Sequence, residues 1–283
     1  MCRGPGLPSV SGMTTLALEG IKAKQQKTWA SGDYGAVAAL IQPISEKLVE
    51  AADLPAGARV LDVATGTGNA AIAAARCLCD VVGVDYVPAL LERARERAAA
   101  ERFTITFAEG DAEALPCGDG EFDAVLSVVG VMFAPNQETV AAELLRVSRP
   151  GGTIALANWT PDGFIGELFR TVGRRVPPPP GVRAPVEWGS EPRVRELLGD
   201  AVSDLTVTPR TFTFRFASAA AFADYFRANY GPTLKAFEAL DDDNGKLLYA
   251  DLVDLAERHN VSTTDATVRI PAAYAEVVAH KAK

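Results

Sequence analysis

The sequence VLDVATGTGNAA, residues 60–71, predicts the architecture of the chain around it. It begins as a short apolar strand, turns through Gly66 and Gly68, and continues into an alanine-rich run typical of a helix. The glycines allow a sharp turn and let a ligand approach the backbone closely. This order of strand, glycine loop and helix indicates a nucleotide-like ligand at the end of the strand.

Further strands and helices alternate after this stretch. Alternation of this kind predicts parallel strand-helix-strand units, which the right-handed crossover winds into a doubly wound sheet. The last two strands, near 205–216 and 267–280, are separated by helices and are expected to form an antiparallel hairpin at the edge. We expect strands at 59–64, 81–84, 103–107, 122–129, 153–158, 205–216 and 267–280.

The chain of 283 residues is expected to form one α/β domain with additions. Met13 is a candidate native start, because regular sequence begins only after it. The expected segments are a disordered tail (1–13), an N-terminal helical cap (14–55), a cofactor-binding core (56–159), an insertion or lid after the fifth strand (160–202), and a C-terminal part with sheet-edge strands and helices (203–283).

The charge balance argues against several partners. There are 28 Lys and Arg against 36 Asp and Glu, a formal net charge of −8, so the positive field that holds nucleic acid or anionic lipid is missing. No stretch approaches the roughly 18 uninterrupted apolar residues of a membrane span. The four cysteines lack the spacing of a disulfide framework or a zinc site, which favours a reducing, cytoplasmic setting.

Three carboxylates lie where parallel strands are expected to end. Asp85 closes the second strand, where it can accept both hydroxyls of a ribose. In Gly110-Asp111-Ala112, after the third strand, Asp111 can accept the exocyclic amine of adenine. Asp62, just before the glycine loop, would attract an ammonium group. Acceptors for ribose, adenine and ammonium together predict S-adenosylmethionine as the cofactor.

Two other function classes stay open at this point. Gly66-x-Gly68-x-x-Ala71 also satisfies a loose dinucleotide fingerprint, so an NAD(P)-linked oxidoreductase is an alternative. Asp62 argues against it, because a carboxylate would repel the pyrophosphate of a dinucleotide. A non-catalytic S-adenosylmethionine-binding protein is the second alternative. Within the enzyme class, the acidic balance disfavours an RNA methyltransferase.

Five motifs in order resemble those of class I S-adenosylmethionine-dependent methyltransferases, most closely the ubiquinone/menaquinone-biosynthesis type. The resemblance covers residues 24 to about 159. It implies a Rossmann-like sheet of seven strands, one of them antiparallel. The motifs are 60–71 (VLDVATGTGNAA), 83–85 (GVD), 110–112 (GDA), 122–125 (FDAV) and 149–152 (RPGG).

The resemblance also implies a set of cofactor-binding residues. They are Thr65, Gly66 and Gly68 on the methionine part, Asp85 on the ribose, Tyr86 on a face of adenine, Gly110, Asp111 and Ala112 at the adenine edge, Ser127 and Val128 facing the methionine and sulfonium, and Tyr34 on the cofactor carboxylate. Asp62 joins them as the acceptor of the ammonium group.

Methyl transfer from a sulfonium is an in-line displacement that alignment alone can accelerate, so no protein nucleophile is required. His259 and His280 lie away from the predicted methyl group, so no catalytic base is named. No cluster of Asp and Asn suggests a metal. We expect a small, largely nonpolar methyl acceptor from quinone or secondary metabolism, and a homodimer is left open. The walls of the acceptor site are expected among Trp159, Phe164, Phe169, Trp188, Phe222, Tyr225, Phe226 and Tyr230.

Overall fold

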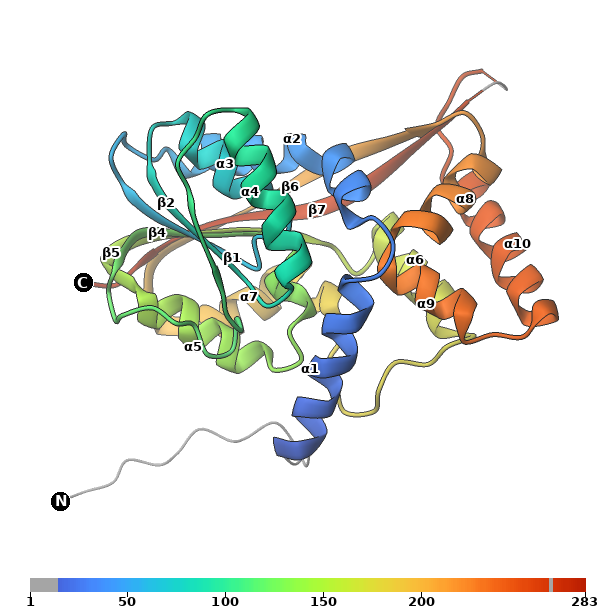
Figure 1. Cartoon of the computed structure of the whole chain (residues 1–283), viewed down its shortest axis with the longest axis horizontal. Helices are drawn as coiled ribbons and strands as arrows, with labels where there is room; N and C mark the ends of the chain where they lie inside the picture. Colours follow the sequence, from blue (N-terminus) through green and yellow to red (C-terminus); the bar gives the residue numbers. More distant parts are fainter. Residues whose placement is uncertain (1–14, 265–266) are drawn as a thin grey trace.

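A seven-stranded sheet in the order β3-β2-β1-β4-β5-β7-β6 runs through the computed structural model, which describes residues 15–264 and 267–283 (Figure 1). The expected tail and Met13 lie outside the described residues. The strands are β1 (Arg59–Val63), β2 (Asp80–Asp85), β3 (Thr106–Glu109), β4 (Phe122–Val128), β5 (Ser148–Trp159), β6 (Val202–Phe216) and β7 (Val268–Lys281).

The strand directions confirm the expected fold class. The pairs β1–β2, β1–β4, β2–β3 and β4–β5 are parallel, and β7 runs antiparallel to both β5 and β6. The expected hairpin is therefore present, with β7 inside and β6 at the edge. The expected strand at 103–107 is wrong at its start, because the chain pairs with β2 only from Thr106 onward. Phe103 instead packs, partly buried, against the core.

Helices cover both faces of the sheet. Figure 1 shows α2 and α3 over one face and α5 with α7 over the other. The helices are α1 (Thr15–Trp29), α2 (Tyr34–Ala52), α3 (Asn69–Arg76), α4 (Pro88–Ala100), α5 (Gln137–Val147), α6 (Phe164–Gly173), α7 (Glu191–Leu198), α8 (Ala219–Asn229), α9 (Gly231–Glu238) and α10 (Asp242–Arg258). In the described part of the chain, no helix combines the length and apolar character needed to cross a membrane.

The central strands are continuous apolar runs because helices bury both of their faces. Leu61 of β1 lies in register with Val82 of β2 and Val125 of β4. Leu61 and Val125 have no exposed surface. This rigid centre fixes the ends of β1, β2 and β4, where the glycine loop and its neighbours begin.

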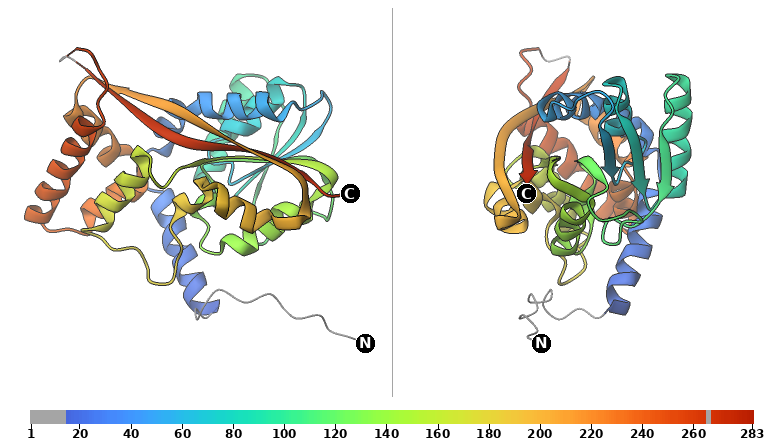
Figure 2. Two further views of the ribbon diagram at one scale, coloured as in Figure 1. Left: turned by 180° about the vertical axis from the view of Figure 1, so that it is seen from behind. Right: turned by 90° about the vertical axis from the view of Figure 1, so that its left-hand side faces the viewer.

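The two chain segments after β5 pack in different places. Within 160–202, α7 packs on α5, and α6 packs on α10 and β7. Along the chain, the helices α8–α10 follow β6 and precede β7. Figure 2 shows β6 and β7 running together past the rest of the sheet toward these helices. The five segment boundaries stay a prediction.

The break between α1 and α2 depends on one glycine. Gly32 has a φ of +70°, and a Cβ there would lie 2.7 Å from the backbone oxygen of Asn229. Asp33 occupies the N-cap position of α2, but its side chain makes no capping hydrogen bond.

Candidate active site

A cavity of about 660 Å³, part of it open to solvent, lies at the carboxyl ends of the central strands. In an open parallel sheet this edge is where ligands bind. Of the residues predicted to bind the cofactor, the structure brings seven to the cavity wall: Tyr34, Gly66, Asp85, Tyr86, Gly110, Asp111 and Ala112.

The glycine loop after β1 has the backbone that the sequence requires. Gly66 and Gly68 have φ angles of +55° and +84°, a region that favours glycine. Gly68 forms the N-cap of α3, and a Cβ there would lie 3.2 Å from the Cβ of Ala94 on α4. A Cβ on Gly66 would meet only Tyr34, at 3.5 Å. Gly68 therefore serves helix packing, whereas Gly66 faces the cavity.

Asp85 ends β2 at the wall of the cavity and is only 4% exposed. Its two carboxylate oxygens accept N–H groups from Gly66, at 2.8 Å, and from Val87, at 2.9 Å. Burial raises the pKa of this carboxyl to about 6, against the opposing effect of the backbone N–H groups. Each oxygen has a second lone pair, so the carboxylate can still accept hydroxyl donors.

Asp62 and Thr65 build the loop and do not line the cavity. Asp62 is 1% exposed, and its Oδ2 accepts the Thr65 hydroxyl at 2.6 Å and the Ala71 N–H at 2.9 Å. Burial raises the pKa of the Asp62 carboxyl to about 7. The structure thus places Asp62 behind the loop, where it joins the end of β1 to the start of α3.

Ser127 and Val128 also lie outside the cavity wall. Ser127 is fully buried, and its hydroxyl donates to the backbone oxygen of Val63 at 2.7 Å. The same hydroxyl accepts the Val131 N–H at 3.1 Å. The prediction that Ser127 and Val128 contact the cofactor rests on their position at the end of β4. The chain reaches the cavity only after that strand, at Val129 and Gly130.

Two strained residues that the sequence does not reveal meet at the cavity. Ala64 follows β1 and Val129 follows β4, with φ angles of +53° and +51°. A β-branched residue such as Val129 with a positive φ costs roughly 1–3 kcal/mol of strain. Residues strained in this way are concentrated at functional sites. A Cβ on Gly130 would lie 2.7 Å from the Ala64 oxygen, so the two strand ends approach closely. Only glycine permits that approach.

Helix α1 crosses the cavity and is held by polar side chains, which the sequence reading missed. The Lys22 ammonium lies 2.7 Å from carboxylate oxygens of both Asp111 and Glu113. Gln25 donates to the Phe133 oxygen at 3.0 Å, and Gln26 donates to the Tyr86 oxygen. These contacts join α1 to the ends of β2, β3 and β4. Asp111, the predicted adenine acceptor, is therefore paired with a lysine.

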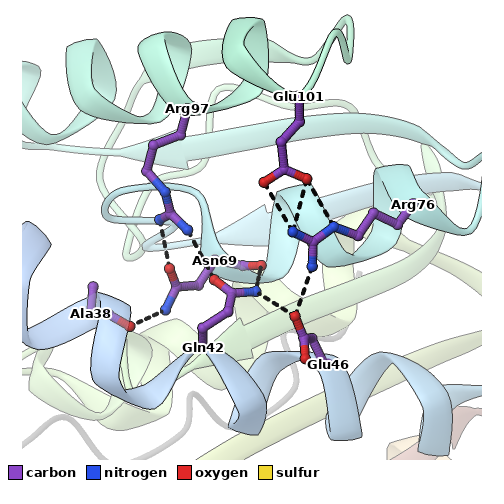
Figure 3. Close-up of polar contacts among 7 residues, drawn as sticks. All are labelled: Ala38, Gln42, Glu46, Asn69, Arg76, Arg97 and Glu101. Carbon is purple, nitrogen blue, oxygen red and sulfur yellow. Dashed lines mark hydrogen bonds and ion pairs between the residues drawn. The ribbon is translucent and has the colours of Figure 1, made fainter.

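Arg97 of α4 supports the glycine loop and does not line the cavity, and Figure 3 shows its contacts with Asn69 and Gln42. Its guanidinium donates to the Thr67 backbone oxygen and to the Asn69 side chain, both at 2.7 Å, and to Gln42 of α2 at 2.9 Å. Asn69 in turn donates to the Ala38 oxygen. One half-buried cation thus links α2, α3, α4 and the loop.

Comparison with known proteins agrees with this geometry. A family described as a methyltransferase domain matches residues 60–152. The uncharacterized protein Rv1405c of Mycobacterium tuberculosis is 42% identical over 229 residues, which cover 79% of this chain and 82% of that protein. The chain belongs to the S-adenosylmethionine-dependent methyltransferase family.

More distant relatives of this methyltransferase are also named as methyltransferases. Demethylmenaquinone methyltransferase of Deinococcus radiodurans is 41% identical over 124 residues, 42% of this chain and 52% of that enzyme. Phosphoethanolamine N-methyltransferase 2 of Haemonchus contortus, solved with S-adenosyl-L-methionine, has the same fold with a TM-score of 0.55 at 18% identity. That match covers 85% of this chain and 53% of the worm enzyme. None of these comparisons supports the oxidoreductase alternative.

A second cavity of about 350 Å³, part of it open to solvent, adjoins the first in this methyltransferase, and the two share Trp29, Tyr34, Val129 and Phe133. Of the aromatic residues predicted to enclose an acceptor, Trp159, Phe226 and Tyr230 line it. The others do not: Phe164, Trp188 and Phe222 are core residues, and Phe169 and Tyr225 pack against the core.

The two histidines lie outside both cavities. The His259 ring nitrogen Nε2 is 2.7 Å from a Glu167 carboxylate oxygen, and His280 lies 3.6 Å from Asp204. Among the described residues, no group of three or more His, Cys, Asp or Glu is arranged to hold a metal ion. Neither cavity wall therefore presents an imidazole.

Proposed function

We propose that this methyltransferase transfers the methyl group of S-adenosylmethionine to a small, largely apolar acceptor. The observation that carries the cofactor half of this proposal is Asp85, a carboxylate that is 4% exposed and yet forms part of the cavity wall. A buried carboxylate is stable only where donors reach it, and ribose hydroxyls are such donors.

The cavity residues fit S-adenosylmethionine from the ribose outward. Asp85 would accept the ribose hydroxyls, and Tyr86 would lie against adenine. Asp111 and Ala112 would meet the adenine edge once the amine competes with Lys22 for the carboxylate. The open space beside Gly66 leaves room for the methionine part, since only Tyr34 would approach a side chain there.

The remaining predicted residues would act through the structure they hold. Asp62, Thr65 and Gly68 fix the loop, and Ser127 and Val128 bring β4 to the point where Val129 reaches the cavity. The bound cofactor supplies an electrophilic methyl group. The chain then needs to align the acceptor with it and to keep water out, which are the contributions that such a displacement requires.

The setting of the reaction is part of the same proposal. Cys77, Cys79 and Cys117 are free thiols, which suits a cytoplasmic enzyme. The apolar second cavity and the partial likeness to a demethylmenaquinone methyltransferase support an acceptor from quinone or secondary metabolism.

Titration calorimetry with S-adenosylmethionine, S-adenosylhomocysteine and NADH tests this function. We expect the two adenosyl ligands to bind and NADH not to bind. Asp85→Ala should weaken their binding by roughly 1.5–3 kcal/mol, because charge-assisted hydrogen bonds to the ribose are lost.

Asp80→Ala is the matched control, since Asp80 begins the same strand at its opposite, exposed end and should leave the affinity unchanged. Binding of NADH alone, or equal affinities for wild type and Asp85→Ala, would remove the assignment of this site.

A further inference from the structure

The first cavity carries both signs of charge at the place proposed for the adenine edge. Among the described residues that line this cavity, Lys22 is the one cation, and Asp85 and Asp111 are the acids. Lys22 comes from α1, whereas Asp111 follows β3. The Lys22 Nζ lies 2.7 Å from the Asp111 Oδ2. The cavity wall therefore presents an ammonium group directly beside one of its two carboxylates.

Glu113 keeps the Lys22 ammonium at this position. The Glu113 side chain is only 7% exposed, and its Oε2 lies 2.7 Å from the Lys22 Nζ. Its other oxygen, Oε1, accepts the Asn136 N–H at 2.8 Å. A buried carboxylate is stable only where donors reach it, so Glu113 holds the ammonium in place independently of Asp111. Lys22 can therefore stay beside Asp111 while a ligand competes for that carboxylate.

Lys22 remains charged and keeps a donor for a ligand. Burial would lower the pKa of its ammonium group, but the hydrogen bonds to Asp111 and Glu113 outweigh burial and hold the pKa above its usual value. An ammonium group has three N–H donors. Asp111 and Glu113 take up two of them, so the third is available to an acceptor atom in the cavity.

Asp111 has a matching capacity to accept. Its Oδ1 accepts the Glu113 N–H at 2.9 Å, and its Oδ2 accepts from Lys22. Each oxygen keeps a second lone pair. Asp111 alone would accept from an amino group on a purine and repel a carbonyl oxygen, whereas the Lys22 ammonium can donate to that oxygen. The pair offers a partner to either group.

We propose that Lys22 is a specificity-determining residue of this site, and that the site accepts purine thioethers with either a 6-amino or a 6-carbonyl group. S-adenosylhomocysteine and S-inosylhomocysteine are one such pair of ligands. This inference rests on the proposed function, because that function places the adenine edge at Asp111. The amino group uses Asp111 as its acceptor, and the carbonyl group uses Lys22 as its donor.

Calorimetric titration of the wild-type protein with both ligands is the first test. We expect S-inosylhomocysteine to bind less than about a hundredfold more weakly than S-adenosylhomocysteine, because its carbonyl still finds a charged donor. A site whose own polar group is left without a partner imposes a penalty of about 10⁴-fold or more. Ring nitrogen N1 also changes from acceptor to donor between the two ligands. This change is the same for every variant, so it cancels when affinity ratios are compared.

Lys22→Met should raise the preference for S-adenosylhomocysteine over S-inosylhomocysteine by about tenfold, because the carbonyl loses its donor and faces Asp111 alone. Any loosening of α1 weakens both ligands alike and leaves the ratio unchanged. Lys24→Met is the matched control, since Lys24 is exposed on the same helix and does not line the cavity. It should keep the wild-type ratio.

Asp111→Asn should shift the ratio the opposite way by about tenfold, because an amide does not repel the carbonyl and accepts less strongly from the amine. This variant keeps the inference testable where Lys22→Met does not fold. A Lys22→Met ratio within about twofold of wild type, or shifted toward S-inosylhomocysteine, would overturn the inference. Absence of S-inosylhomocysteine binding to wild-type protein that binds S-adenosylhomocysteine would also overturn it. Failure to bind S-adenosylhomocysteine would instead count against the proposed function.

Discussion

The buried carboxylates Asp62 and Asp85 show how two similar residues of one site serve different ends. Both lie at the ends of neighbouring strands, and burial raises the pKa of each carboxyl, to about 7 and about 6. Asp85 reaches the cavity wall, whereas Asp62 is surrounded by its own loop. The difference is testable, because Asn can replace Asp62 with its amide oxygen in the position of Oδ2.

Asp62→Asn should raise the free energy of unfolding by roughly 1–3 kcal/mol at pH 8, because the ionised carboxylate is buried only in the folded state. The folded pKa lies above the unfolded value, so the wild type gains stability as the pH falls through 7. The advantage of the variant should shrink as the pH falls from 7 and vanish near pH 4, the pKa of the unfolded carboxyl. Thermal unfolding of apoprotein across this range measures it.

Affinity for S-adenosylmethionine separates the two roles proposed for Asp62. As a residue that only holds the loop, Asp62→Asn should keep the affinity within about twofold, since both of its hydrogen bonds survive. A loss of tenfold or more in this variant would instead favour direct contact of Asp62 with the ammonium group.

For single residues of the site, the sequence predicted a role where the residue type is rare for its position, and it predicted nothing elsewhere. Gly66 and Asp85 could be predicted. Glycine turns freely in the loop after β1, and Asp85 is the one acidic residue at the end of the apolar run of β2. Val129 could not be predicted, since nothing in its type indicates a positive φ. Lys22 and Gln26 act from a helix whose place over the cavity depends on tertiary packing.

Among the elements, α4 has the least expected part in the site. Its sequence predicts an amphipathic helix packed on the sheet, and that packing is present through Leu91 and Ala94. The same helix also carries Arg97, which donates to the Thr67 oxygen in the glycine loop and to Asn69 and Gln42 (Figure 3). The apolar periodicity of the sequence predicts which face of the helix is buried. It does not predict the partners of a long polar side chain such as Arg97.

Arg97→Met should loosen the loop and weaken S-adenosylhomocysteine binding by about tenfold, while the stability falls by about 1–3 kcal/mol. The reason is that the Thr67 oxygen, Asn69 and Gln42 lose a shared donor. Calorimetry and thermal unfolding measure the two effects.

Arg93→Met is the control on the same helix, because Arg93 is exposed and pairs only with Glu96 in the described structure. An Arg97→Met protein with wild-type affinity would show that the loop keeps its shape without this support.

At the scale of the whole molecule, helix α1 is the part of the cavity wall with the least buried surface. Helix α1 lies over the cavity, and none of its side chains between residues 18 and 29 is fully buried. Apart from the ring of Trp29 at its end, which packs on Phe133 and Tyr34, it is attached through Lys22, Gln25 and Gln26. Polar contacts of this kind exchange readily with water. The rest of the fold rests on a continuous apolar core.

Hydrogen exchange followed by mass spectrometry should therefore show fast exchange over residues 18–29 in the apoprotein. Saturation with S-adenosylhomocysteine should slow it there, because the ligand holds α1 in place. Peptides from β7 should exchange slowly in both states and serve as the internal control. Equal exchange of α1 with and without ligand would contradict this account.

The placement of α8–α10 between β6 and β7 has a consequence for how such enzymes diversify. Phe226 and Tyr230, which line the second cavity, come from this segment, whereas Gly66 and Asp85, which line the first, come from the sheet core. Recombination within one paired hairpin can therefore exchange part of the wall of the second cavity and leave the wall of the first intact. Chimaeras joined at the tips of β6 and β7 are a rational starting library for new acceptor selectivity.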